Sequence, residues 1–369
     1  MEFLDELSSG VPAVGAPSIQ REFAVSYLET AGVLLLAPLL LGLAIETPLF
    51  LLADRYPRKW FISGGLCGMA AGAFAAALAP TALVLTAALS LAAVASGVAS
   101  LAQSTLVDAF PDQRERVMTR WVMLGWAGDL AAPALIAGLA ALSVGWRGAY
   151  AVVGALLAAW ALAVARSRLP PRADPDEPTP GMWASLRAAL ACRRLMFWLV
   201  ACWLCSLLDE ILVVFASLYL RDELGAGVAE RSAVLAAFMI GGAAGLAATD
   251  RLLHRTTPRR LLLIAASSCS LLYLLWMAAP SVWSSALAMA AVGATSAPLY
   301  PLAAAQAYAA LPGRSGAVQA AGNLLVPLDL ALPLLLGWLA DRHGAGAALI
   351  VLVAQPVGLA LVASIRRAW

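Results

Sequence analysis

The sequence predicts an all-α integral membrane protein with twelve transmembrane helices in two pseudo-symmetric six-helix bundles. Of the 369 residues, 62% are hydrophobic and 12% are charged, with a mean hydropathy of +0.84. Soluble domains are roughly 45–50% apolar and 25% charged. Apolar runs of about twenty residues, the length that crosses the hydrocarbon core, alternate with short polar clusters. Fragments of the first half also recur in the second at a nearly constant offset.

The expected spans are the apolar runs between charged residues, glycines and prolines. They lie near residues 3–20, 26–52, 60–79, 82–106, 119–142, 147–166, 195–220, 232–249, 259–279, 282–310, 317–340 and 346–365. The first span is short on its cytoplasmic side, because only four residues precede Asp5. The helix is either truncated there or begins upstream, and we favour an upstream start. The acidic, proline-containing opening predicts no cleavable signal peptide.

Arginines and lysines concentrate in the loops that follow the second, fourth, sixth and eighth spans. The positive-inside rule then places both termini in the cytoplasm, in a plasma (inner) membrane. The domains expected are a bundle at 1–166, a cytoplasmic linker at 167–194 and a second bundle at 195–369. The linker contains PPRADPDEPTPG, which is too polar and proline-rich to pack. Residues 183–194 form either an amphipathic helix on the membrane surface or a frayed start of the seventh span.

Four fragments of the first half have counterparts in the second. Leu4–Glu6 recurs as Leu208–Glu210, and Asp129–Pro133 resembles Asp329–Pro333, with shifts of 204 and 200 residues. The loop at 110–114 resembles 311–314, and the Asp-Arg pair at 54–55 recurs at 250–251. Symmetric halves that meet at a central axis are typical of transporters.

The loop after the second span carries a motif of its own, FLLADRYPRK at residues 50–59. It resembles the signature loop of the major facilitator superfamily, although Phe50 and Pro57 replace the two glycines. The fifth span has a loose form of the family's glycine- and proline-rich motif, at Gly125, Gly128 and Pro133. A weaker similarity to the fosmidomycin-resistance exporter group rests on the opening LDEL and on DRYPRKW.

This resemblance implies a cytoplasmic gate formed by Asp54, Arg55, Arg58 and Lys59, with Asp108, Arg114 and Arg116 as partners. Glu46 lies two turns further inside the second span and belongs with this group, where it either relays protons or anchors the loop. The alternative is that these charges only set topology, but that would not explain an aspartate kept among the basic residues.

Carboxylates are expected near the middle of the bilayer. Asp129, Asp209 and Asp329 lie about ten to fourteen residues into their spans, and Asp5 lies about fifteen residues from the outer end of its span. Glu6 and Glu210 adjoin two of these aspartates. An ionised aspartate at this depth costs about 2.5–3.5 kcal/mol, and no arginine, lysine or histidine lies at comparable depth. Such groups face a cavity and bind protons or substrate, or remain protonated and pack through hydrogen bonds. Neighbours on a helix differ by about 100 degrees, so we expect the aspartates to face the cavity.

Polar residues elsewhere in the spans are candidates for the cavity lining: Gln103, Tyr300, Gln306 and Asn323. The sequence has no Walker A motif, no GxSxG and no zinc-binding pair, so we expect no enzyme, no cofactor and no metal. The basic residues form no patch of the size that nucleic acid requires.

The sequence therefore predicts a monomeric secondary active transporter that works by alternating access, with a small molecule, protons and the lipid bilayer as partners. An acidic cavity without bases favours proton-coupled export, by an antiporter, of a cationic or amphipathic compound. One alternative is proton-coupled uptake of a neutral or zwitterionic metabolite. The other is a non-transporting membrane receptor or scaffold that has kept the fold.

Overall fold

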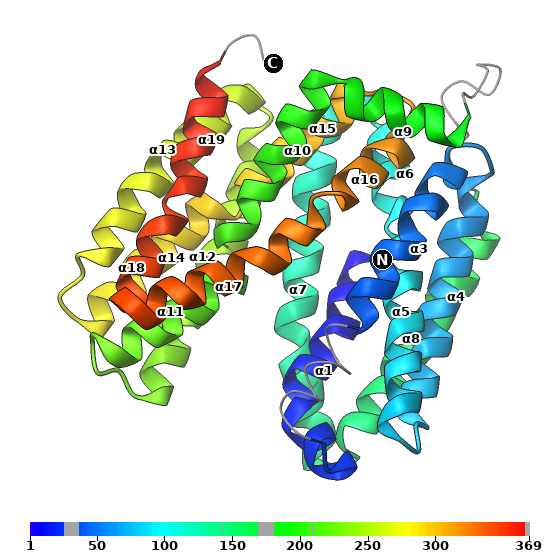
Figure 1. The fold of residues 1–369 in the computed structure, drawn as a ribbon, viewed down its shortest axis with the longest axis horizontal. Helices are drawn as coiled ribbons and strands as arrows, with labels where there is room; N and C mark the ends of the chain where they lie inside the picture. The colour runs from blue at the N-terminus through cyan, green and yellow to red at the C-terminus, as the bar shows by residue number, and fades with distance from the viewer. Residues whose placement is uncertain (26–36, 143, 169–180, 209, 366–369) are drawn as a thin grey trace. The chain divides into compact units, whose positions relative to one another are not determined.

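The computed structural model describes residues 1–25, 37–142, 144–168, 181–208 and 210–365, and the regular structure within them is helical (Figure 1). Along the first half run α1 (Glu2–Phe23), α3 (Ala37–Ala53), α4 (Arg58–Ala77), α5 (Ala82–Ala99), α6 (Leu101–Ala109), the 3₁₀ turn η2 (Pro111–Gln113), α7 (Arg114–Ala141), α8 (Gly145–Arg166) and α9 (Met182–Ala191). The second half contains α10 (Arg193–Cys205), η3 (Ser206–Leu208), α11 (Glu210–Asp222), α12 (Val228–Leu252), α13 (Pro258–Met277), α14 (Val282–Ser296), α15 (Leu299–Ala310), α16 (Ser315–Asn323), α17 (Val326–His343), α18 (Ala345–Leu352) and α19 (Ala354–Ser364).

Ten helical stretches among the described residues are long and apolar enough to cross a membrane, and they coincide with the third to twelfth expected spans. The second expected span corresponds in its described part to α3, which is apolar but shorter. The first corresponds to α1, with Asp5 in its first turn. The expected layout of twelve spans therefore matches the order of the helices.

The chain folds into two compact units, and each of them includes a short segment from the other half of the sequence. Unit 1 comprises residues 1–110, 124–188 and 312–323, and unit 2 comprises 111–123, 189–311 and 324–369. The helix α16 therefore belongs to unit 1, although it lies late in the sequence. The first residues of α7 belong to unit 2, although they lie early.

Glycines allow the closest helix crossings within the units. At Gly128 of α7, an added Cβ would lie 2.4 Å from the main-chain oxygen of Phe3 in α1. At Gly241 of α12, it would lie 1.9 Å from the main-chain oxygen of Ala290 in α14. Without a hydrophobic driving force between spans, such close contact between helix backbones is a main source of stability.

The seventh span of the chain, which lies in unit 2, is a broken helix. It runs as α10, the 3₁₀ turn η3 and then α11. The main-chain N–H of Leu208 donates to Oε1 of Gln355 at 2.6 Å, and Gln355 is 1% exposed. A buried N–H freed by a helix break must find a partner in a membrane, and this side chain supplies it.

Helix α9 is separate from α10, with Cys192 between them. The last part of the expected linker is therefore a helix of its own and not a frayed start of α10. Ser185 and Ala189, one turn apart, are buried, whereas Trp183 is 65% exposed. This pattern is that of a short amphipathic helix.

Candidate functional site

Asp5 lies in the first turn of α1 and is half-buried. The hydroxyl of Ser96, on α5, donates a hydrogen bond of 2.6 Å to Oδ1 of Asp5. The amino terminus of the chain also acts electrostatically on this carboxyl. The strongest link of Asp5 to its neighbours is thus a neutral hydroxyl on another helix of unit 1.

Glu6 points to a different helix from Asp5. The positions of Gly125 and Gly128 on α7 face it, since a Cβ added at either would lie 3.3 or 3.0 Å from a side-chain carbon of Glu6. The hydroxyl of Ser9 donates to Oε2 of Glu6 at 3.1 Å. The two neighbouring acids therefore diverge, as the helical turn of about 100 degrees requires.

The other predicted carboxylates are placed less fully. Asp129 lies on α7, half-buried, next to the glycine where α1 crosses. Asp209 lies outside the described residues, and the same holds for the side chains of Glu210, at the start of α11, and Asp329, on α17. The structure therefore brings Asp5, Glu6 and Asp129 into unit 1.

The candidate lining residues fall in different settings. Gln103 is buried on α6, and Tyr300 on α15 is 41% exposed. The amide of Gln306, buried on α15, donates at 2.8 Å to Oε1 of Glu115 in the first turn of α7. This last bond is internal to unit 2 and ties α15 to the start of α7.

Glu46 of α3 contacts the last residue of α16, because Nδ2 of Asn323 donates to its Oε2 at 3.3 Å. Asn323 was expected as cavity lining and Glu46 as part of the gate, and the structure brings the two together. The carboxylates of Glu46 and Asp5 also interact electrostatically.

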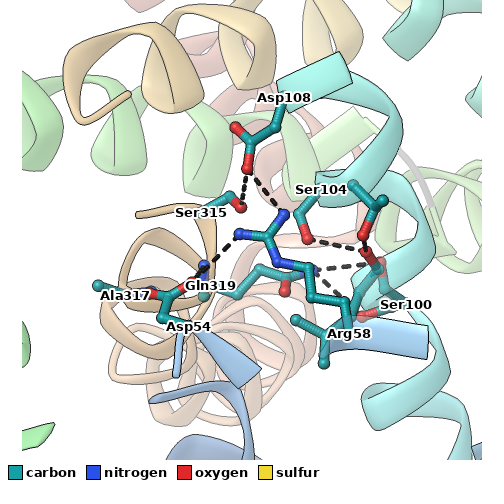
Figure 2. A network of polar contacts seen from close by, with 11 residues as sticks. Asp54, Arg58, Ser100, Ser104, Asp108, Ser315, Ala317 and Gln319 are labelled. Carbon is teal, nitrogen blue, oxygen red and sulfur yellow. Dashed lines mark hydrogen bonds and ion pairs between the residues drawn. The ribbon is translucent and has the colours of Figure 1, made fainter. Parts of the chain in front are cut away.

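A network of ionic and polar contacts occupies the end of α3 and the start of α16 (Figure 2). The guanidinium of Arg58 bonds Asp108 at 2.7 Å and Asp54 at 3.2 Å. The hydroxyl of Ser315 donates to the same Oδ2 of Asp108 at 2.7 Å. Arg58 and Asp108 are only 14% and 15% exposed, so these charges are largely shielded from solvent.

Asp54 caps the N-terminus of α16. Its two carboxylate oxygens accept hydrogen bonds from the main-chain N–H groups of Gly316, at 3.0 Å, and Ala317, at 2.9 Å. The first N–H groups of a helix have no partner within the helix, and they carry the positive end of its dipole. Asp54 is therefore an N-terminal cap supplied from another part of the chain.

The pKa of the Asp54 carboxyl is raised above its ordinary value of 3.8, since its burial disfavours the charged form. Arg58 and the two main-chain N–H groups oppose this rise. The carboxyl consequently binds a proton more tightly here than it would in water.

One face of α16 carries polar side chains at a spacing of four residues. Ser315 contacts Asp108, Gln319 donates to the hydroxyl oxygen of Ser100 at 3.2 Å, and Asn323 donates to Glu46. All three partners belong to unit 1: Asp108 lies on α6, Ser100 lies between α5 and α6, and Glu46 lies on α3. Figure 1 shows α16 beside these helices. The spacing of 315, 319 and 323 was visible in the sequence but was not recognised.

Three other residues were expected in the gate: Lys59, Arg55 and Arg114. Lys59 donates to the main-chain oxygen of Ser167 at 2.8 Å, at the end of α8. Arg55 is exposed. Arg114 begins α7 in unit 2, and its Nε is buried without a hydrogen-bond partner among the described residues.

Unit 2 holds a related contact at the sequence counterpart of Asp54. Asp250 near the end of α12 pairs with Arg116 at 3.2 Å and with Arg120 at 3.0 Å, both on α7. The position that corresponds to Arg116, at a shift of 200 residues, is Gly316. One half thus uses an arginine side chain where the other uses a main-chain N–H group.

Comparison with known proteins identifies the fold family. The family model of the Major Facilitator Superfamily matches residues 1–328. The chain belongs to this superfamily. It is accordingly a multi-pass membrane protein and a secondary transporter with the twelve-helix fold of two six-helix bundles. No curated protein matches the chain.

Several solved transporter structures have the same fold. A variant of the E. coli fucose:proton symporter FucP matches with a TM-score of 0.80 at 17% identity, over 99% of this chain and 97% of that one. A bacterial homologue of the iron transporter ferroportin gives 0.73 at 15%, over 98% and 97%. The proton:xylose symporter XylE gives 0.73 at 13%, over 98% and 92%.

The functional residues that sequence reasoning missed are mostly small or uncharged: Ser96, Gly97, Ser315, Gly316, Ala317 and Gln319. Only the four-residue spacing on α16 could have pointed to two of them, Ser315 and Gln319. No group of histidine, cysteine, aspartate and glutamate within the described ranges could hold a metal ion.

Proposed function

We propose that this superfamily member is a proton-coupled exporter of a cationic or amphipathic small molecule, and that Asp5 carries the coupled proton. The observation that supports this proposal is the contact of Asp5 with Ser96, a neutral hydroxyl, on a membrane helix. The helices α3, α5 and α16 contain no lysine, arginine or histidine. A carboxyl in such surroundings takes up a proton more readily than a solvated one.

The charge of these surroundings favours a cation over an anion. Buried anionic substrates are ordinarily met by arginine or lysine. Between Glu2 and Arg21, the charged side chains of α1 are Asp5 and Glu6. The charged side chain of α3 is Glu46. We infer further that the protein is a monomer with bundles at 1–166 and 195–369, a linker at 167–194 and both termini in the cytoplasm.

The test uses purified protein in liposomes, an imposed pH gradient and ethidium as a fluorescent organic cation. The wild type should move ethidium against the proton flux, and Asp5→Asn should abolish the dependence on the gradient. The matched control is Asp112→Asn, an exposed loop acid in η2, which should transport as the wild type does. Gradient-driven transport that is unchanged in Asp5→Asn would disprove the role of Asp5.

A second candidate function is proton-coupled uptake of a neutral metabolite. It is favoured by the fold likeness to FucP and XylE, which are described as proton symporters. The two candidates differ in the direction of proton movement. Addition of L-fucose or D-xylose to proteoliposomes without a gradient should make the external medium more alkaline if the protein is a symporter. No such change is expected of an exporter of organic cations.

A further inference from the structure

We propose that Glu46 is a second proton-binding residue, and that its loss of a proton releases α16 from the other helices of unit 1. This inference rests on the proposed proton coupling and adds the step that links it to a moving segment. It is based on the position of Glu46, which lies between the Asp5–Ser96 hydrogen bond and the C-terminal end of α16.

Helix α5 receives two carboxyl groups side by side. Ser96 bonds to Asp5, and the next residue, Gly97, lies directly against Glu46. A Cβ added at Gly97 would lie 2.1 Å from the carboxyl carbon of Glu46, and one added at Gly42 would lie 2.9 Å from Oε1. The carboxyl of Glu46 therefore occupies a space that exists because two glycines line it.

The partners of Glu46 do not compensate a negative charge. Asn323 supplies one neutral amide N–H to Oε2, whereas Oε1 lies over the glycines. The charged group that faces Glu46 from α1 is Asp5, whose own charge repels it. The helices α3, α5 and α16 bring no basic residue. An ionised Glu46 is therefore costly in this position, and a protonated one is not.

The cost of ionisation is greater while α16 is bound, because its last residue contacts the carboxyl. When Asn323 and α16 move away, water can reach Glu46 and solvate its charge. By linkage, the state that holds the proton more tightly is favoured by acid. Protonation of Glu46 therefore stabilises bound α16, and deprotonation favours its release.

The contacts of α16 would allow the whole helix to be released at once. Its three polar contacts and the cap by Asp54 are all made to unit 1. A turn at Leu324 and Leu325 separates it from α17. Asn323 is the last helical residue before that turn, so Glu46 holds the end of the segment nearest the point where the chain bends.

Hydrogen exchange of the α16 amides, corrected for the intrinsic effect of pH, tests the proposal in purified protein without substrate or gradient. In the wild type, exchange should be about tenfold faster at mildly alkaline than at mildly acidic pH, which is an ordinary size for the coupling of proton binding to a conformational change. Glu46→Gln mimics the protonated side chain, so its exchange should be slow at both pH values.

One further variant separates the effect of Glu46 from that of Asp54, and another removes the contact of Glu46 with α16. Asp54→Asn should accelerate exchange overall yet retain most of the ratio between the two pH values. Asn323→Ala should exchange at acidic pH about as fast as the wild type does at alkaline pH. Unchanged exchange in α4 shows that each variant is folded. If Glu46→Gln keeps the ratio of the wild type, or if Asn323→Ala leaves exchange unchanged, the proposal is overturned.

The outcome is independent of the transport assay for Asp5. Loss of the pH ratio in Glu46→Gln supports the proton-binding role of Glu46 even if Asp5→Asn transports normally. A normal ratio in Glu46→Gln combined with inactive Asp5→Asn refutes this inference and leaves the proposed function in place.

Discussion

The carboxylate of Asp54 accepts a hydrogen bond of 3.0 Å from the main-chain N–H of Gly316, a residue 262 positions away in the sequence. The contact works because residue 316 has no side chain. A Cβ at this position would lie 2.3 Å from the main-chain oxygen of Phe50 and 2.7 Å from Oδ1 of Asp54. The end of α3 and the start of α16 can therefore approach only with glycine between them.

Gly316→Ala should weaken the binding of α16 to unit 1, because the main chain of α3 cannot yield to the added methyl group. We expect a loss of about 1–3 kcal/mol, typical of overpacking. Hydrogen exchange of the α16 amides measures it. The control is Gly64→Ala in α4, where nothing lies within 4 Å, and which should be neutral or slightly stabilising. Equal effects of the two substitutions would contradict the close approach.

Arg58→Ala should be strongly destabilising, because it leaves the carboxylates of Asp54 and Asp108 without their shared cation. Removal of one partner from a largely buried ion pair costs about 3–5 kcal/mol. Chemical unfolding in detergent micelles measures this loss. Arg58→Lys should recover only part of it, since an ammonium group cannot present two separate N–H groups in the fixed geometry of a guanidinium.

The control for Arg58 is Arg166→Ala, an exposed arginine at the end of α8. It should change the free energy of unfolding by less than about 0.5–1 kcal/mol. A second Asp108→Asn substitution should partly rescue Arg58→Ala, because it removes one uncompensated charge. If the double variant were no more stable than the single one, Asp108 would not depend on Arg58.

Acid should stabilise the folded protein through the buried carboxyl of Asp54, whereas the contacts of this carboxyl with α16 and Arg58 favour its charged form. Burial raises the pKa of Asp54 from 3.8, so the folded protein holds this proton more tightly than the unfolded chain does. This contribution is fully present below pH 3.8 and is lost as the pH rises through the raised pKa. The measurement is the pH dependence of unfolding, with Asp54→Asn as the comparison.

The sign of this effect is open to a direct check. The slope of stability against pH should be shallower in Asp54→Asn, whose amide does not titrate. It should be steeper in Arg58→Ala, since loss of the cation raises the pKa of Asp54 further. A slope that is the same in all three proteins would show that Asp54 does not titrate between pH 3.8 and neutrality.

Arg116 should matter more than Arg120 for the contact with Asp250 in unit 2. The two side chains are 19% and 54% exposed, respectively. Arg116→Gln should cost about 1–3 kcal/mol as a shielded charged hydrogen bond, and Arg120→Gln about 0–1 kcal/mol as a surface pair. Double-mutant cycles with Asp250→Asn give both coupling energies. A larger coupling for Arg120 would contradict the ranking by exposure.

Much of the fold followed from composition and order along the chain. The twelve expected spans match the helices because hydrocarbon thickness imposes a fixed run of apolar residues, which a sequence shows directly. Acids such as Asp5 and Glu46 stood out because an apolar span with a carboxyl is unusual. Ser96 and Gly97 did not stand out, since small residues are common in every membrane helix.

The sequence by itself determined that the protein is a membrane protein of two related halves with acids inside its spans. The tertiary structure alone decided that α16 belongs to unit 1, that Asp54 caps it and that Glu46 meets Asn323. The positions of the spans, and the unusual acids within them, can be read from the affinity of each segment for the bilayer, which is a local property. Partners depend on which helix surfaces can approach closely, and that is settled only when glycines such as Gly316 and Gly97 are packed against their neighbours.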